Sequence, residues 1–470
     1  MKDYCKYFIN KKITIMGLGI LGRGVNVAKF LAECAADLII TDLKKEEELK
    51  PSLKQLKKFE NIKYTLGRHE FADFKNRDFI IKAGGVPFDS LYIAEAKKNK
   101  IPIEMDESLF AKLAERVVIV GITGAKGKSI TTCLIYEILK ANEKNFADKR
   151  HIYLGGNVKG QATLPLLKKT NPGDIVVMEL DSWRLQGFYD AKISPHISVF
   201  TNFMEDHMNY YKGDIKRYFE DKANIFKYQT QDDFLILGES FVKDIKKTGL
   251  FNSFSDFKKE VQSKIILTKE KDIPKNWKIK ILGGHNLENI AAAVAALRLL
   301  KVKEPIIKKT IENFKGMPGR LEFIKEIKGI KFYNDTTATT PNAAIAALDA
   351  FKNYKGKIIL IGGGADKELD FKQYVKTVKK YVKALILFKG EASDKIVRGL
   401  EIEKRDPAGK KAKIKIFNEV LSMREAFKLA TSCAERGDII LLSPGAASFG
   451  VFKNEFDRGE QFDKLARKLK

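Results

Sequence analysis

The sequence is poor in cysteine and contains no long apolar segment. Four of its 470 residues are cysteines, at positions 5, 34, 133 and 433, and they lie far apart without the close spacing of metal ligands. That scarcity suits a reducing cytoplasm. No apolar run approaches the roughly 18 residues of a membrane span, and the first residues lack the apolar core of a signal peptide. We therefore expect a soluble cytoplasmic protein without membrane insertion.

Acidic residues are outnumbered in this chain. There are 86 lysines and arginines against 60 aspartates and glutamates, which gives a formal net charge of +26. Such an excess of positive charge can favour binding to nucleic acid or to a membrane surface. However, the lysines are spread along the whole chain, and no run reaches five like charges. We favour a lysine-rich proteome or attraction of anionic substrates, and we expect a monomer with no nucleic-acid partner.

The length indicates several domains. A chain of 470 residues is too long for one ordinary core, so about three domains are expected. Apolar strand-like runs alternate with amphipathic stretches throughout, which predicts an α/β protein. We expect a Rossmann-like N-terminal domain at 1–112, a central domain with a parallel sheet of the P-loop ATPase type at 113–316, and a C-terminal Rossmann-like domain at 317–470.

The most informative segment is Gly-Ile-Thr-Gly-Ala-Lys-Gly-Lys-Ser at 121–129, between an apolar run and an amphipathic stretch. A strand, a glycine loop, Lys-Ser and a helix make a phosphate-binding loop, in which backbone N–H groups and the helix N-terminus face a polyphosphate. Lys128 would reach the β- and γ-phosphates, and the Ser129 hydroxyl would ligate Mg²⁺. Five residues separate Gly121 from Gly127, one more than in the standard loop.

A second glycine motif lies near the N-terminus. Gly-Leu-Gly-Ile-Leu-Gly at 17–22 follows a strand-like run, and Asp42 ends the next one. This is the dinucleotide fingerprint, a glycine turn with an acid about 20 residues later. The domain is short for a full six-stranded dinucleotide fold, so a single nucleotide is the more economical ligand. A dehydrogenase would leave the phosphate loop unexplained.

Acids and a histidine follow buried-looking strands in the middle of the chain. Glu179 ends the run 175–178, and His207 closes a polar segment after the run 197–200. The carboxyl ends of parallel strands are where α/β sheets bind ligands. Taken alone, His207 could equally be a locally packed histidine.

The order of these motifs, with His285-Asn286 and Asn289 opening a later helix, resembles that of the Mur ligases, the ATP-dependent amide ligases of peptidoglycan precursor synthesis. The segment Asn-Asp-Thr-Thr-Ala-Thr at 334–339 is similar to a stretch of the D-glutamate-adding members. Leu442-Ser443-Pro444, Phe452-Lys453-Asn454 and Arg458-Gly459 are similar to their C-terminal signature. The resemblance covers essentially the whole chain.

The resemblance implies an ATP site, two Mg²⁺ sites and a catalytic set of Lys128, His207 and Lys222. Lys222 matches the lysine that Mur ligases carbamylate, which would turn a cation into a carboxylate-like ligand. The implied metal-site residues are Ser129, Glu179, His207 and Lys222. The implied ATP-binding residues are Thr123, Gly124, Ala125, Lys126, Gly127, Lys128, Ser129, Ile130, Asn286, Asn289, Arg320 and Asp335.

The resemblance also implies two further substrates, UDP-N-acetylmuramoyl-L-alanine and glutamate. The residues implied for the UDP-linked substrate are Gly19, Ile20, Leu21, Asp42, Gly84 and Asn157. Those implied for the amino acid are Thr339, Lys367, Ser448 and Phe456. A cation and hydroxyls there would bind the two carboxylates of glutamate.

Several positions depart from the family pattern. Thr337 replaces its usual lysine, Gly319 its usual histidine, and Asp181-Ser182-Trp183-Arg184 its usual Ser-Ser-Phe-Gln. These departures leave the glutamate enantiomer open: D-glutamate is favoured over an L-glutamate-adding branch. The sequence also leaves open the functions of another Mur ligase, of a folylpolyglutamate-type synthetase and of a non-enzymatic nucleotide-gated binding protein.

Overall fold

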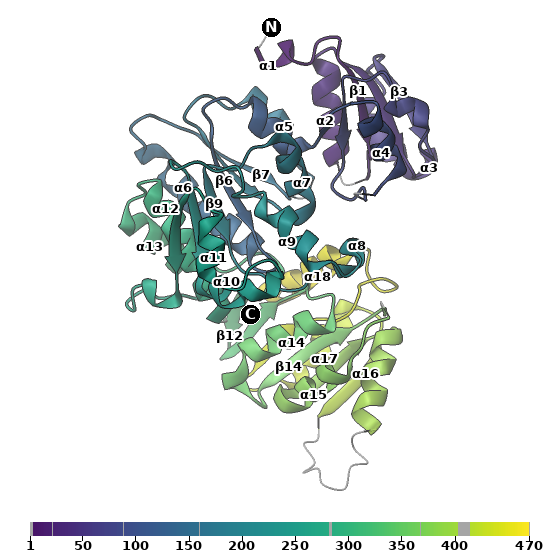
Figure 1. The fold of residues 1–470 in the computed structure, drawn as a ribbon. Helices are drawn as coiled ribbons and strands as arrows, with labels where there is room; N and C mark the ends of the chain where they lie inside the picture. Colours follow the sequence, from purple (N-terminus) through teal and green to yellow (C-terminus); the bar gives the residue numbers. More distant parts are fainter. Residues whose placement is uncertain are drawn as a thin grey trace. The chain divides into compact units, whose positions relative to one another are not determined.

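A computed structural model describes residues 3–20, 22–87, 89–158, 160–281, 284–366, 368–402 and 414–469. These residues form three sheets, each flanked by helices (Figure 1). The fold is the expected α/β arrangement of an N-terminal, a central and a C-terminal sheet. Within the described part of the chain, no helix is both long and apolar enough to cross a membrane.

The N-terminal sheet is parallel, and its strand order is β3-β2-β1-β4-β5. Its strands are β1 (Lys12–Met16), β2 (Asp37–Asp42), β3 (Ile62–Leu66), β4 (Phe79–Lys82) and β5 (Ile103–Glu104). Its helices are α1 (Asp3–Lys6), α2 (Arg23–Glu33), α3 (Glu46–Leu56) and α4 (Leu91–Lys98). Five strands fit the expectation of a domain smaller than the six-stranded dinucleotide fold.

The cysteine pattern was misleading in one respect. Cys5 and Cys34 form a disulfide, although 29 positions separate them and their spacing gave no indication of a pair. Helix α1 and the end of α2 bring the two side chains together.

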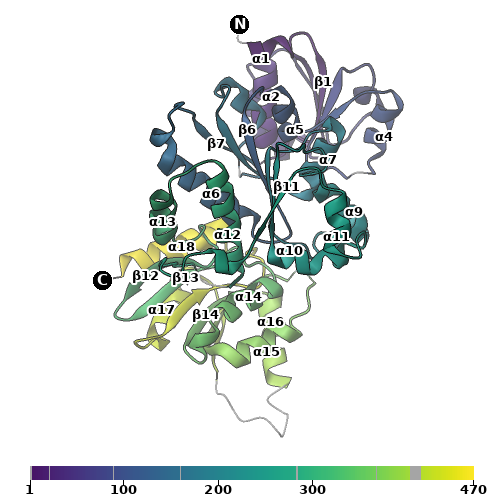
Figure 2. The ribbon, with the colours of Figure 1, turned by 60° about the vertical axis from the view of Figure 1, so that its left-hand side comes forward.

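The central sheet is also parallel, in the order β11-β10-β9-β6-β8-β7. Its strands are β6 (Val118–Thr123), β7 (Ile152–Gly156), β8 (Ile175–Glu179), β9 (Ile197–Phe200), β10 (Phe234–Gly238) and β11 (Lys264–Thr268). The helices that follow β5 are α5 (Asp106–Leu113), α6 (Lys128–Asn142), α7 (Ser182–Ala191), α8 (Met208–Tyr211), α9 (Ile215–Ala223), α10 (Glu239–Asp244), α11 (Phe254–Lys259), α12 (Gly284–Leu299) and α13 (Glu304–Asn313). Helix α6 lies on one side of this sheet, and α7 and α9 lie on the other (Figure 2).

The C-terminal sheet is mixed, in the order β12-β13-β17-β14-β15-β16, with β12 antiparallel to β13. Its strands are β12 (Glu322–Ile327), β13 (Ile330–Asn334), β14 (Ile358–Gly363), β15 (Val382–Phe388), β16 (Lys415–Val420) and β17 (Ile439–Leu442). Its helices are α14 (Pro341–Ala350), α15 (Lys372–Tyr381), α16 (Glu391–Ile402), α17 (Met423–Cys433) and α18 (Glu455–Lys468).

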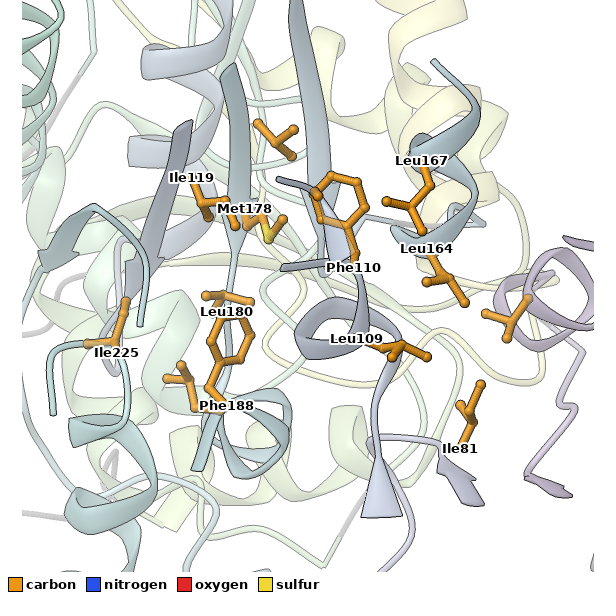
Figure 3. Close-up of a cluster of buried hydrophobic side chains, with 14 of the residues drawn as sticks. Ile81, Leu109, Phe110, Ile119, Leu164, Leu167, Met178, Leu180, Phe188 and Ile225 are labelled. Carbon is orange, nitrogen blue, oxygen red and sulfur yellow. The ribbon is translucent and has the colours of Figure 1, made fainter. Parts of the chain in front are cut away.

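One hydrophobic cluster spans the N-terminal and central sheets, and a second, smaller one lies within the N-terminal domain. In the cluster that spans both sheets, Leu109 and Phe110 of α5 lie with Ile81 of β4 and Met178 of β8 (Figure 3). The chain accordingly divides into two compact units, 1–277 with 287–311, and 278–286 with 312–470. The predicted boundaries after residues 112 and 316 stay predictions.

Candidate functional site

The glycine loop at 124–127 joins β6, in the middle of the central sheet, to α6. Gly124 has φ of 142° and Gly127 has φ of 85°, so both adopt backbone conformations that favour glycine. A Cβ atom on Gly124 would lie 2.0 Å from Thr201 Oγ1, and one on Gly127 would lie 2.3 Å from Asn289 Oδ1. These glycines therefore let the loop run directly against the end of β9 and against α12.

The loop is held by Asn202, which follows β9. Its carbonyl oxygen accepts from Ala125 N at 3.0 Å, and its Oδ1 accepts from Lys126 N at 2.9 Å. Within α6 the bond from Thr131 N to Gly127 O is 3.0 Å long. The N–H groups of residues 128–130 come before this first bond of the helix. They are therefore at the helix N-terminus, which is where helices bind anions.

Two lysines converge on the carbonyl oxygens of this loop. Lys128 Nζ donates to Gly124 O at 3.0 Å and to Ala125 O at 3.1 Å, and Lys222 Nζ donates to Gly124 O at 2.8 Å. Lys222 is 1% exposed. Burial lowers the pKa of Lys128, and it lowers the pKa of Lys222 well below the usual lysine range, with the neighbouring Lys128 charge adding to the effect. The fold thus joins two lysines that lie far apart along the chain.

Carboxylates lie at the end of the adjacent strand β8. Glu179 is buried, and its Oε1 accepts from Asn157 Nδ2 at 3.4 Å. Asp181 is also buried and begins α7 by accepting from Arg184 N at 3.0 Å. Burial raises the pKa of Asp181, but Arg184, Lys222 and Lys128 outweigh burial and lower it overall. Asp181 is thus a charged neighbour of both lysines.

His207 occupies a left-handed backbone position with φ of 57°. Its ring centroid lies 4.7 Å from that of Trp183, and its Nε2 lies 3.8 Å from Asp206 Oδ2. Burial lowers the pKa of His207, which favours a neutral imidazole. Among the described residues, no three side chains of the His, Cys, Asp and Glu types are already gathered as a metal site. A cation there would therefore need other ligands, such as hydroxyl, phosphate or carbamate oxygens.

The glycine turn of the N-terminal domain is built around Asp42. Its Oδ2 accepts from Leu18 N at 2.8 Å and from Gly19 N at 2.9 Å, and its Oδ1 accepts from Lys44 N at 2.9 Å. The acid of the fingerprint therefore shapes the turn itself. Ile20 is 58% exposed beside it. Leu21 lies outside the described residues.

Gly84 and Asn157 lie on two other loops of the same unit. A Cβ atom on Gly84 would be 3.8 Å from Arg184 Nη1. Asn157 N donates to Glu179 O at 2.7 Å, so Asn157 and Glu179 are held side by side.

In the C-terminal domain, Asp335 is buried at the end of β13. Its Oδ1 accepts from Leu321 N at 3.1 Å, and its Oδ2 accepts from Ser443 Oγ at 2.7 Å. Burial raises the pKa of Asp335 to about 7, although the hydrogen bonds from Ser443 and Leu321 and the charge of the exposed Arg320 oppose the shift. Asn286 and Asn289, also expected near ATP, are buried on α12.

The residues expected at the amino-acid site differ in exposure. Thr339 is half-buried, Ser448 is buried, and Phe456 is 40% exposed. Lys367 lies outside the described residues. Arg458 had no role predicted from the sequence, yet it is fully buried and donates to Thr336 Oγ1 at 3.1 Å and to Thr336 O at 2.9 Å.

Models of three known domains match this chain in order. They are a Mur ligase MurD-like N-terminal domain at residues 11–104, a Mur ligase middle domain at 122–297, and a Mur ligase glutamate ligase domain at 319–445. A UDP-N-acetylmuramoylalanine–D-glutamate ligase from Borreliella burgdorferi (strain ZS7) is 35% identical over 480 residues, 98% of each chain. One from Acetivibrio thermocellus is 33% identical and covers 100% of this chain and 99% of its own.

The chain belongs to the Mur ligase family.

Solved structures of other Mur ligases share the fold at lower identity. MurF from Thermotoga maritima, solved in complex with ADP, has a TM-score of 0.56 at 17% identity, with 100% of both chains covered. UDP-N-acetylmuramate–alanine ligase MurC from the same organism has a TM-score of 0.55 at 19% identity, covering 97% of this chain and 99% of its own. The Mur ligase family and the three-domain fold inferred from the sequence are thus confirmed.

Proposed function

We propose that this protein is an ATP-dependent ligase that joins D-glutamate to UDP-N-acetylmuramoyl-L-alanine in peptidoglycan precursor synthesis. The observation that carries this proposal is the meeting of Lys128 and the buried Lys222 at the phosphate loop, in a chain similar over its full length to D-glutamate ligases. The names of those relatives favour D-glutamate over L-glutamate.

The chemistry requires activation of a carboxylate. A carboxylate is a poor electrophile, so ATP would first phosphorylate the L-alanine carboxylate to an acyl phosphate and release ADP. The glutamate amine would then attack the acyl carbon, and the tetrahedral intermediate would expel inorganic phosphate. The amide forms, and the amine loses its proton to solvent or a nearby base.

Lys128 would act on the phosphates. Its ammonium group donates to the carbonyls of Gly124 and Ala125, directly beside the N-terminus of α6. From this position it would neutralise the charge that gathers on the γ-phosphoryl oxygens. Thr123, Lys126, Ser129 and Ile130 complete the proposed phosphate cradle, and Asn286, Asn289, Arg320 and Asp335 are proposed for the remainder of ATP.

The residues fit Mg²⁺ when Lys222 is carbamylated. Carbamylation requires a neutral amine, and burial, which lowers the pKa of Lys222, favours that form. The carbamate would join Glu179, His207 and the Ser129 hydroxyl as ligands, mostly the oxygen donors that Mg²⁺ prefers. Bound Mg²⁺, at two sites in our proposal, would supply further neutralisation of phosphate charge.

The remaining assignments concern the N-terminal glycine turn, two loops near it and the C-terminal domain. Gly19, Ile20, Leu21, Asp42, Gly84 and Asn157 are proposed to bind the UDP-linked substrate, and Thr339, Lys367, Ser448 and Phe456 are proposed to bind glutamate. A cytoplasmic monomer remains our expectation for the state in which the protein works.

ATP turnover tests this function directly. In the presence of Mg²⁺, we expect the release of ADP from ATP to require both UDP-N-acetylmuramoyl-L-alanine and glutamate. A nucleotide-gated binding protein would bind ATP without turnover, another Mur ligase would require a different precursor, and a folylpolyglutamate-type synthetase would respond to a folate. Any of those three results would overturn the proposal.

A further inference from the structure

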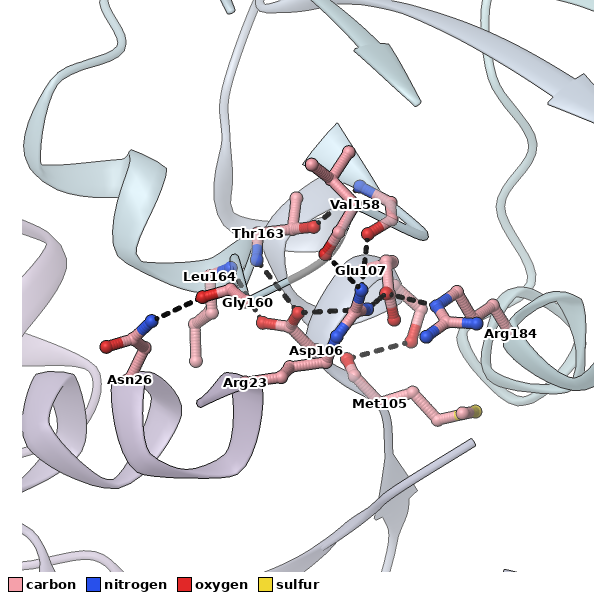
Figure 4. Close-up of polar contacts among 12 residues, drawn as sticks. Arg23, Asn26, Met105, Asp106, Glu107, Val158, Gly160, Thr163, Leu164 and Arg184 are labelled. Atoms are coloured by element: carbon pink, nitrogen blue, oxygen red, sulfur yellow. Dashed lines mark hydrogen bonds and ion pairs between the residues drawn. The ribbon is translucent and has the colours of Figure 1, made fainter. Parts of the chain in front are cut away.

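A series of charged side chains, in which half-buried arginines alternate with buried carboxylates, runs from the glycine turn of the N-terminal domain to the end of β8. Arg23 is the first residue of α2, immediately after Gly22. Its Nη1 forms an ion pair with Glu107 Oε1, and the Glu107 side chain is 2% exposed. Arg184 Nε donates to the same carboxylate oxygen at 2.6 Å (Figure 4). One buried oxygen therefore joins a guanidinium of the N-terminal domain to a guanidinium of the central domain.

Arg184 continues the series toward the phosphate loop. Its Nη1 forms an ion pair with Asp181 Oδ2, and its backbone N–H bonds Asp181 Oδ1 at 3.0 Å. Asp181 follows Glu179 by two positions and interacts electrostatically with Lys222 and Lys128. The series thus ends among the groups proposed to act on the acyl phosphate.

A second arm leaves the same arginine. Arg23 Nη2 donates to Gly156 O at 2.8 Å and to Val158 O at 3.1 Å, the carbonyls on either side of Asn157 (Figure 4). The Asn157 backbone N–H in turn donates a hydrogen bond of 2.7 Å to the Glu179 carbonyl oxygen. Arg23 therefore holds the Asn157 loop as well as Glu107.

These contacts explain what Arg23 does at the start of α2. A guanidinium at a helix N-terminus beside a glycine turn would ordinarily be expected to meet a phosphate. Here its Nη donors point to the central domain, toward the carboxylates of Glu107 and, at 3.9 Å, Asp106, and toward two carbonyl oxygens. The fork geometry matters, because these contacts use two separate nitrogens of the guanidinium, whereas a lysine ammonium has a single nitrogen.

We propose that Arg23 is a positioning residue, with Glu107 and Arg184, that sets the span between the nucleotide end of the UDP-linked substrate and its reacting carboxylate. This inference rests on the proposed function. The nucleotide end would sit at the turn that precedes Arg23, and the carboxylate end would sit near Asn157 and Glu179. Since a misplacement of about 1 Å at a reacting centre can cost on the order of 10²-fold in rate, a fixed span between the two ends is a kinetic requirement.

The variant R23K tests the span while keeping the charge. We expect the Kd for UDP alone, measured by calorimetry, to stay within about twofold of wild type, because UDP would occupy only the turn. We expect kcat/KM for UDP-N-acetylmuramoyl-L-alanine to fall by about tenfold or more, with KM for ATP nearly unchanged. The matched control is R68K, which changes an arginine of the same domain that is 72% exposed and paired with Glu70 at the surface.

Two outcomes would overturn the proposal. One is wild-type kcat/KM in R23K. The other is an equal loss of affinity for UDP and for the whole substrate, which would make Arg23 a local support of the turn. A wild-type protein that forms no amide at all would instead refute the proposed function, so the two failures are distinguishable.

The double variant R23K/R184K tests whether the two arginines act as one unit. Because both share Glu107, we expect the double variant to lose clearly less kcat/KM than the product of the two single losses. Independent, multiplying losses would contradict a shared network. Thermal unfolding of all three variants separates these kinetic effects from a general loss of folded protein.

Discussion

At the scale of single residues, the proposed catalysis depends on Lys128. We predict that Lys128→Ala lowers the ligation rate by on the order of 10²-fold or more, because charge on the transferred phosphoryl group loses its neutralising ammonium. Binding of the UDP-linked substrate should remain nearly intact, since its nucleotide end is proposed to bind in the N-terminal domain. Steady-state ligation and calorimetry measure the two effects. Lys140→Ala, at the far end of the same helix, is the control, and normal turnover in the Lys128 variant would refute the phosphate-loop assignment.

Lys222 is predicted to work as a carbamate. Lys222→Ala should be nearly inactive, and short carboxylic acids such as formate or acetate should restore part of the activity by supplying the missing metal-ligand charge. Wild-type activity should also fall in CO₂-depleted buffer and return on addition of bicarbonate. Lys216→Ala changes an exposed lysine on the same helix and should behave as wild type. Unchanged activity in the Lys222 variant would make this residue an ordinary buried lysine.

Asp335 should make the protein less stable as the pH rises. Burial raises its pKa to about 7 in the folded state, so the folded state holds a proton that the unfolded state has already released. The contribution of Asp335 to the free energy of unfolding is fully present below the pKa of about 3.9 that the group has in the unfolded chain. It is lost as the pH rises toward 7, by roughly 1.4 kcal/mol per pH unit. Relative to wild type, Asp335→Asn should therefore unfold at progressively higher temperatures between pH 5 and about pH 7, then level off. If the melting temperatures of the two proteins instead change with pH by the same amount across this range, the raised pKa of Asp335 is disproved.

At the scale of elements, the phosphate loop depends on its close approach to α12. We predict that Gly127→Ala weakens ATP binding by about tenfold or more, because the new methyl group would displace Asn289 in addition to straining the backbone. Gly173→Ala is the matched control: its φ of 91° gives similar strain, but no atom lies within 4 Å of the added Cβ. Both variants should lose about 1–2 kcal/mol of stability from a left-handed alanine. Equal ATP affinities in the two variants would show that the approach to Asn289 is unimportant.

The sequence predicted the elements that carry a strong local signal. The glycine loop before α6 and the apolar runs of β6, β8 and β9 were visible because a buried parallel strand is a short continuous apolar segment. Strands β3, β7, β10, β11 and β12 were missed. Strands β3 and β11 each expose part of their length and mix lysine with apolar residues, whereas β10 is a buried apolar run like the strands that were predicted. The fingerprint acid Asp42 was found, but its bonds to the turn were not, since they depend on backbone geometry.

Contacts between distant positions were the part that the sequence left hidden. The approach of Lys222 to Gly124 and the sharing of Glu107 by two arginines each join residues more than 70 positions apart. Nothing in local spacing marks such a pair, and no role was predicted for Arg23. The pair of Cys5 and Cys34 escaped notice for the same reason.

At the scale of the whole molecule, the proposed function determines the product. The protein should join one enantiomer of glutamate to UDP-N-acetylmuramoyl-L-alanine, since mirror-image glutamates present the same charges along different directions. A site built on charge-assisted bonds discriminates strongly, because each misplaced bond leaves a polar group unpaired. The full-length relatives point to the D form.

The most direct measurement is a competition between isotopically labelled D- and L-glutamate, with ATP, Mg²⁺ and UDP-N-acetylmuramoyl-L-alanine, followed by mass spectrometry of the product. We predict a single amide product that carries almost only the D-glutamate label, with one ADP released for each amide formed. Comparable incorporation of both labels, predominant use of L-glutamate, or no amide product would contradict the proposed function.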